Sequence, residues 1–223
     1  MSEFREIPFR LHNPYLSKLK SWEMLLFLVA IAIFIGNSFA SPYFLNAWNL
    51  SDATFNFTEK AMIAFAMALL IIAGEIDLSV ASIIALASTA MGAVAQFDVS
   101  TPTLVLVGLS VGISCGAFNG FLVTKFGLAS IVVTIGTMSL FRGISYIILG
   151  DKAYRGYPEE FAFFGQGYVF WVISFEFVLF ILTAIMFGLL LHKSQFGRTV
   201  YAIGNNQTGA FFSGINVHRV KFL

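Results

Sequence analysis

Gly74-Glu75-Ile76-Asp77-Leu78-Ser79 interrupts an otherwise apolar chain, and this interruption decides which fold the sequence can form. The segments on either side, Ala61 to Ala73 and Val80 to Ala95, are apolar and rich in small residues. A carboxylate inside a membrane is costly and usually marks a functional position. Glu75 and Asp77 therefore lie either at a membrane surface or inside a functional cavity.

The composition places the chain in a lipid bilayer. Of its 223 residues, 58% are hydrophobic and only 11% are charged, and the mean hydropathy is +0.83. A soluble domain carries about 25% charged residues. The net charge of +1 says nothing about nucleic acid, but the basic residues are scattered at span ends and form no stripe, so no nucleic-acid partner is expected. The single Cys115 excludes an intrachain disulfide.

Six apolar runs have about the length that a membrane-spanning helix needs. They predict an all-α integral membrane protein with about six transmembrane helices. The predicted organisation is a cytoplasmic N-terminal segment (1–21), a transmembrane domain (22–191) and a cytoplasmic loop (192–223), with the first run interpreted as an uncleaved span rather than a signal peptide. The runs are Trp22 to Ala40, Thr54 to Ala73, Leu78 to Ala95, Thr103 to Val123, Ala129 to Leu149 and Tyr168 to Leu191.

The distribution of Lys and Arg predicts the orientation. With the N-terminus in the cytoplasm, the inner segments carry nine basic residues and the outer segments three. This orientation places Glu75 and Asp77 near the inner face. There, Asp77 is expected to cap the helix that follows Leu78, because its carboxylate can accept hydrogen bonds from exposed N–H groups and suits that end of the helix dipole. Residues two apart do not share a helix face, so Glu75 has no assigned role.

Two further sets of residues lie inside the predicted spans. Arg142 is calculated to lie about 20 Å from the inner end of its helix, and Glu176 about 12 Å from the outer end of its own. Counted from opposite faces of the membrane, the two depths nearly coincide, so these residues could pair, or could line a pathway for a hydroxylated solute. Asn119 is a third intramembrane polar residue. Glycines repeated every four residues favour close helix packing, with a pathway lining as the alternative. These glycines are Gly108, Gly112, Gly116 and Gly120.

The C-terminal loop contains a compact polar segment. Asn206 is expected to cap a short helix that begins at Gln207 and ends before Gly214. Phe211 and Phe212 would be exposed on this helix, which suggests either docking of another protein or anchoring at the membrane surface.

Several classes of function lack their usual residues. The sequence contains no GxxxxGK[ST] loop for ATP, and all three histidines lie outside the predicted spans, so no metal site or cofactor is expected. A secondary carrier would show paired broken helices, but one break is visible, at Gly74. An intramembrane enzyme would need catalytic groups clustered within the spans. A non-transporting assembly subunit stays open.

Four segments in the same order resemble the ribose-type permeases of bacterial ABC sugar importers. The resemblance extends from about Trp22 to the end of the chain and is nearest to permeases for L-rhamnose and then autoinducer-2, with ribose or xylose permeases as alternatives. The segments are Gly74 to Val80, Gly116 to Val123, Ile131 to Gly143, and Phe196 to Arg198 followed by Tyr201 to Asn206 and Ser213 to Ile215.

This resemblance implies a multi-pass subunit of the bacterial inner membrane. It would pair with a second permease, identical or different, and work with a separate ABC ATPase and a periplasmic sugar-binding protein. By resemblance, the ATPase-coupling element comprises Gly197, Asn205, Asn206, Gln207, Phe211, Phe212, Ser213 and Gly214. The segment marked by Gly74, Glu75, Asp77 and Ser79 is an identifying motif of the family, and Arg142 matches a recurrent arginine.

Two departures from the family pattern stand out. The usual Glu-Ala-Ala of the coupling helix is replaced by Gln207-Thr208-Gly209-Ala210, which lowers its helix propensity. The family also continues for roughly another third of its length, with more spans and a Gly-rich segment. On that basis the chain is expected to be C-terminally truncated.

Overall fold

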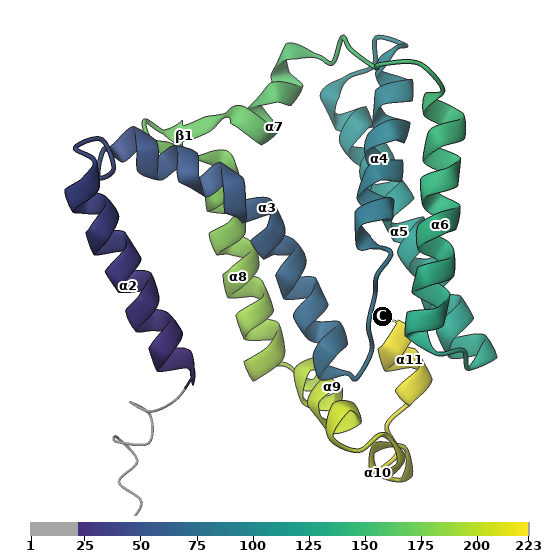
Figure 1. Ribbon diagram of the computed structural model, residues 1–223. Helices are drawn as coiled ribbons and strands as arrows, with labels where there is room; N and C mark the ends of the chain where they lie inside the picture. The colour runs from purple at the N-terminus through teal and green to yellow at the C-terminus, as the bar shows by residue number, and fades with distance from the viewer. Residues whose placement is uncertain (1–21, 223) are drawn as a thin grey trace, which may run out of the picture. The chain divides into compact units, whose positions relative to one another are not determined.

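The computed structural model describes residues 22–222 and contains mostly helices (Figure 1). The predicted N-terminal cytoplasmic segment 1–21 lies outside these residues. The described chain divides into two units, residues 22–50 and 51–222. The first unit contains α2 (Trp22–Ala40) and the beginning of α3 (Ala47–Ile72). In this unit the rings of Phe34 and Phe44 meet edge to face, with centroids 5.1 Å apart.

In the second unit, α4 (Val80–Ala95) packs against α5 (Thr101–Phe126) and α6 (Ser130–Leu149) (Figure 1). Leu86, Cys115 and Phe141, one from each helix, form the buried centre of this group. The second half of α3 lies beside α8 (Phe175–Lys193), where Phe65 stacks on Phe180 at 5.4 Å. The helices α4, α5 and α6 are thus held together by a buried apolar centre, and α3 and α8 by aromatic stacking.

A short connection joins α6 to α8 at one end of the helices. It contains a 3-10 turn, η1 (Glu159–Phe161), then α7 (Ala162–Gln166) and a hairpin of β1 (Tyr168–Phe170) and β2 (Ile173–Ser174). The hydroxyl of Tyr168 donates to Asp52 at 3.4 Å. The pKa of Tyr168 is raised, mainly by partial removal of its hydroxyl from water and secondly by the nearby carboxylate of Asp52. The span that was expected to start at Tyr168 instead starts at Phe175, because Tyr168 belongs to the hairpin that precedes α8.

Three short helices follow α8 at the other end (Figure 1): α9 (Gln195–Asn205), α10 (Gln207–Phe212) and α11 (Val217–Phe222). Ile203, Ala210 and Val217, one from each helix, form a second buried cluster. This shared core makes α9, α10 and α11 a small packed group, which we call the α9–α11 group.

Five described helices are long and apolar enough to cross a membrane: α2, α3, α5, α6 and α8. The remaining predicted span, Leu78 to Ala95, forms the 16-residue helix α4, which begins two residues later than expected because the backbone up to Ser79 is not helical. Many large apolar side chains on these helices are exposed, and no residue of the apolar window in α2 or α8 is buried. Such faces are compatible with lipid as the surrounding solvent. The chain is therefore an all-α integral membrane protein.

Candidate functional site

The segment Gly74–Ser79 joins α3 to α4 as non-helical backbone (Figure 1). Gly74 ends α3 with a φ of +79°, a conformation that glycine adopts without steric cost. Its N–H donates to Ile71 O at 3.1 Å, while the N–H of Glu75 donates to Leu70 O at 2.8 Å. This pair of bonds is the Schellman pattern, which satisfies the last carbonyls of a helix. The break predicted at Gly74 is thus a defined helix end.

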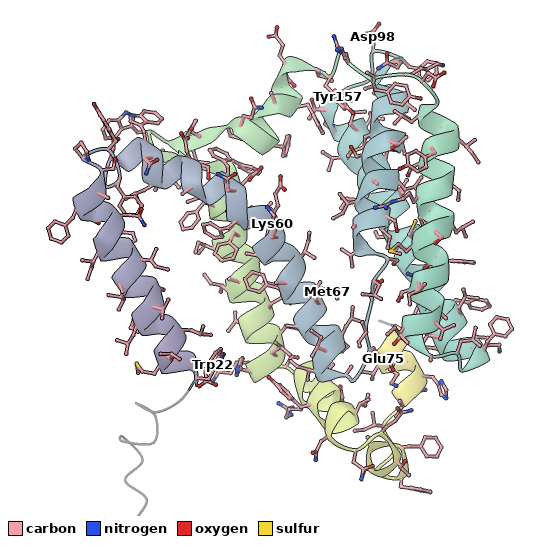
Figure 2. All side chains as sticks on the ribbon, in the orientation of Figure 1. Trp22, Lys60, Met67, Glu75, Asp98 and Tyr157 are labelled. Atoms are coloured by element: carbon pink, nitrogen blue, oxygen red, sulfur yellow. The ribbon has the colours of Figure 1, made fainter. Side chains whose placement is uncertain are left out.

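Glu75 has a partner that the sequence did not predict. Its carboxylate forms a salt bridge with Lys221 of α11, and the side chains of Glu75 and Lys221 are only 15% and 13% exposed. The same ammonium donates to Oε1 of Gln207, the first residue of α10, at 2.9 Å. Figure 2 shows Glu75 at the end of α3, beside α11. The acidic side chain is therefore neutralised by the α9–α11 group.

Asp77 starts a chain of hydrogen bonds that ends at Asn119. Its Oδ1 accepts from the backbone N–H of Ser79 at 2.7 Å and from the Ser79 hydroxyl at 2.6 Å. Because that hydroxyl proton points to Asp77, Ser79 Oγ accepts from Nδ2 of Asn119, at 2.8 Å. The polar residues of the interruption and of α5 thus form one network.

The predicted capping role of Asp77 needs correction. The cap residue of α4 is Ser79, and its side chain makes no capping bond. Asp77 lies two residues before this cap residue and binds the N–H of the cap residue itself, as in an Asx-turn. Its carboxylate therefore shapes the interruption rather than satisfying the first turn of α4.

Helix α6 fixes the backbone of the interruption from the other side. The N–H of Ile76 donates to Oγ of Ser130 at 3.2 Å, and the hydroxyl of Thr134 lies 3.4 Å from the carbonyl of Ile76. Both hydroxyls come from the first turns of α6. Sequence reasoning missed both roles, since a serine or threonine at a helix start has many local alternatives.

These elements surround a cavity of about 590 Å³. One wall is polar: Asp77, Asn119, Ser130 and Thr134 lie beside the ion pair of Glu75 and Lys221, and the remaining lining is mostly small or apolar. Asn119 is 6% exposed, and its Oδ1 is buried without a hydrogen-bond partner. A pocket that combines apolar walls with a few hydroxyl, amide and carboxylate groups is suited to a small polar solute.

The glycine row of α5 meets two environments. A Cβ on Gly108 would lie 2.8 Å from the sulfur of Met91 in α4, and one on Gly120 would lie 3.3 Å from the ring of Phe222 in α11. At Gly112 and Gly116 no described atom lies within 4 Å of that position. Gly116 instead lines the cavity. The expected packing contact is therefore absent at these two glycines within residues 22–222.

The pairing of Arg142 with Glu176, one of the two roles left open for these residues, is not formed within the described chain. Arg142 is exposed, and within the described chain no salt bridge joins it to Glu176, whose Oε2 is buried without a partner. The depth of Glu176 was counted from a span start at Tyr168. Since α8 begins at Phe175, Glu176 lies in its first turn and not about 12 Å along it.

The expected short helix of the C-terminal loop is confirmed as α10. Asn206 Oδ1 accepts from the N–H of Gly209 at 2.8 Å, and Gly214 follows the helix with a φ of +82°. Phe211 and Phe212 are 61% and 82% exposed, and their rings meet edge to face at 5.7 Å. Helix α10 therefore exposes two aromatic rings, those of Phe211 and Phe212, and its N-terminus is capped by Asn206.

Two glycines fix how α9 meets its neighbours. A Cβ on Gly197 would lie 2.2 Å from the carbonyl oxygen of Leu191, so the turn from α8 into α9 requires glycine. A Cβ on Gly204 would lie 1.7 Å from the carbonyl oxygen of Ile72, at the end of α3. Sequence reasoning selected Gly197 by resemblance and missed Gly204, since no local pattern reveals its contact with a residue more than a hundred positions away.

Comparison with known proteins identifies the class. A family model described as "Branched-chain amino acid transport system / permease component" matches residues 49–223. The chain, a helical protein with several helices able to cross a membrane, therefore belongs to this family of membrane permeases. No solved structure matches the chain.

Named relatives narrow the similarity to permeases for sugars and related compounds. The chain is 34% identical over 200 residues to "Ribose import permease protein RbsC" of Bacillus subtilis (strain 168), covering 89% of this chain and 61% of that protein. It is 35% identical over 204 residues to "L-arabinose transport system permease protein AraH" of Escherichia coli (strain K12), covering 91% and 62%. "Autoinducer 2 import system permease protein LsrD" of Photorhabdus temperata is 28% identical over 207 residues, with 90% and 62% covered. The chain thus spans about three fifths of these relatives.

Proposed function

We propose that this chain is the membrane-spanning part of a permease subunit that imports a monosaccharide across a bacterial inner membrane. The observation that carries the proposal is the cavity lined in part by Glu75–Asp77, where membrane-type helices surround hydroxyl, amide and carboxylate groups. A monosaccharide matches such a lining, because each of its hydroxyls both donates and accepts hydrogen bonds. The names of two relatives, for ribose and L-arabinose, agree with this solute class.

Within this class we propose L-rhamnose, on the resemblance of the sequence motifs, with ribose, L-arabinose and autoinducer-2 as the alternatives to test. The carrier cycle is alternating access, in which the cavity opens to one side of the membrane at a time. Both described ends of the chain are proposed to face the cytoplasm, in keeping with the excess of Lys and Arg in the inner segments.

The energy is proposed to come from a separate ABC ATPase that docks on α10. The exposed rings of Phe211 and Phe212 support this assignment, since aromatic side chains dominate many protein interfaces. A second permease subunit and a periplasmic sugar-binding protein would complete the importer.

The proposal is tested by uptake of labelled L-rhamnose, ribose and L-arabinose into membrane vesicles that carry the assembled importer. We expect uptake of one of these sugars to require both ATP and the ATPase subunit. Uptake driven by an ion gradient in the absence of ATP would contradict the proposal and favour a secondary carrier. Co-purification with the ATPase without uptake of any sugar would favour an assembly subunit.

The role of the cavity is tested by two threonines of α6. Thr134 lines the cavity, whereas Thr137, one turn later, is equally buried but does not line it. Thr134→Val removes a hydroxyl group from a residue that lines the cavity, so we expect the KM for uptake to rise about fivefold or more, since one lost hydrogen bond is worth about 1 kcal/mol. Thr137→Val, the matched control, should change KM less than about twofold. Equal KM values for the two variants would contradict the assignment of this wall to the solute.

A further inference from the structure

We propose that Lys221 couples α10 to the cavity-lining residues Glu75–Asp77, so that movement of α10 is transmitted to the solute site through the ammonium group of this side chain. The inference rests on the proposed function, because it assigns a role to Lys221 in the same transport cycle. It concerns a contact between the ion pair and α10 that neither the sequence motifs nor the family description specifies.

The geometry of Lys221 supports this role directly. Its Nζ forms a salt bridge with Glu75 and donates to Gln207 Oε1 at 2.9 Å, and its side chain is 13% exposed. An ammonium group has three donors on a flexible stem, so it can bind two acceptors from different elements. One acceptor belongs to the segment that lines the cavity and the other to the first turn of α10.

Both ends of this contact are firmly held. Gln207 follows the cap residue of α10, and the buried cluster of Ile203, Ala210 and Val217 joins α10 to its neighbours. On the other side, Glu75 sits in the Schellman turn of α3. A displacement of the α9–α11 group therefore reaches Glu75 through Lys221, in addition to the direct contacts that Gly204 makes with Ile72 and Phe222 makes with Gly120.

The ion pair is also specific. Within residues 22–222, Lys221 and Glu75 form the one salt bridge found between side chains. Removing one partner of a largely buried pair leaves an uncompensated charge, which is far more costly than losing an exposed pair. Packed interfaces of this kind switch between discrete arrangements and do not deform gradually. If the ion pair of Glu75 and Lys221 formed in one arrangement of the α9–α11 group and broke in another, the backbone next to Asp77 would change.

The test uses the complete importer in proteoliposomes, with its ATPase and binding protein, and labelled L-rhamnose, ribose and L-arabinose each supplied. Glu75→Lys and Lys221→Glu each place like charges together. We expect each to lower ATP-driven uptake about tenfold or more. We also expect each to abolish the stimulation of ATP hydrolysis by sugar, while basal hydrolysis persists. A purely structural role would lower both activities together through loss of assembled complex.

The double variant, Glu75→Lys with Lys221→Glu, restores opposite charges. Gln207 can then donate from its amide NH2 to the new carboxylate, because a glutamine side chain offers both a donor and an acceptor. We expect the double variant to recover most of the uptake and the sugar-stimulated hydrolysis. Arg219→Glu is the matched control, since Arg219 is an exposed cation on the same helix, and it should behave as the unaltered importer.

Each outcome decides the proposal. Single variants that assemble but lose sugar-stimulated hydrolysis, together with recovery in the double variant, support coupling through Lys221. Single variants that fail to assemble and are rescued by the double variant would show a structural role and overturn the coupling role. Single variants that resemble Arg219→Glu would overturn the coupling role and leave the proposed function intact. An assembled double variant without sugar-stimulated hydrolysis would overturn it as well. Absence of ATP-driven uptake in the unaltered importer would overturn the proposed function and the coupling role with it.

Discussion

Replacing Gly204 with alanine is expected to destabilise the protein more than any other single methyl group added to α9. The new Cβ would lie 1.7 Å from the carbonyl oxygen of Ile72 and 2.9 Å from its carbonyl carbon, and both atoms belong to the backbone at the end of α3. A side chain could rotate away, but this backbone is fixed by the Schellman turn at Gly74. Overpacking in a rigid environment costs about 3 kcal/mol. That is a large part of the total stability of a typical domain.

Thermal unfolding in detergent, together with the yield of assembled complex, measures this effect. Gly188→Ala is the matched control, because Gly188 lies in α8 and no described atom lies within 4 Å of its added Cβ. Alanine favours a helix by about 1 kcal/mol over glycine, so this variant should be as stable as the parent or more so. Equal melting temperatures for the two variants would show that α9 does not pack on the end of α3 as described.

Removing both aromatic rings of α10 is expected to have the second large effect. Phe211 and Phe212 are highly exposed in the described chain, and each is proposed to enter a pocket of the ATPase. Interface hot spots contribute about 2 kcal/mol or more each. The combined change Phe211→Ala and Phe212→Ala should therefore weaken ATPase binding by about 700-fold or more, since about 1.4 kcal/mol corresponds to a factor of ten.

Retention of the ATPase on the immobilised permease measures this loss. The control removes two other exposed rings, Phe97 just after α4 and Phe170 in β1, which lie away from α10 (Figure 1). That control should retain the ATPase at the parent level. Full retention after loss of Phe211 and Phe212 would instead favour the alternative interpretation, in which the two rings anchor α10 to the membrane surface.

Local sequence signals predicted the parts of the fold that depend on neighbouring residues. The break at Gly74 was predictable because carboxylates and a glycine interrupt two apolar runs, and the structure ends α3 there. Helix α10 was predictable because a capping asparagine and a terminating glycine lie at the right spacing. Such signals act over a few residues, so they survive in any tertiary context.

Contacts between distant residues were not predictable in the same way. Glu75 and Lys221 are separated by 146 positions, and nothing near either residue indicates the other. The aromatic β1–β2 hairpin was indistinguishable by hydropathy from the start of α8, and that error moved Glu176 to a false depth. Hydropathy reports how apolar a segment is but not whether its backbone is a helix or a hairpin.

The most direct test of the central claim is accumulation of labelled sugar in proteoliposomes that contain the assembled importer, with ATP on the ATPase side and the binding protein on the other. If this chain forms part of an ATP-driven sugar permease, one sugar among L-rhamnose, ribose and L-arabinose should accumulate above its external concentration with ATP, and not with a non-hydrolysable ATP analogue. Equal internal and external concentrations under both conditions would contradict the account.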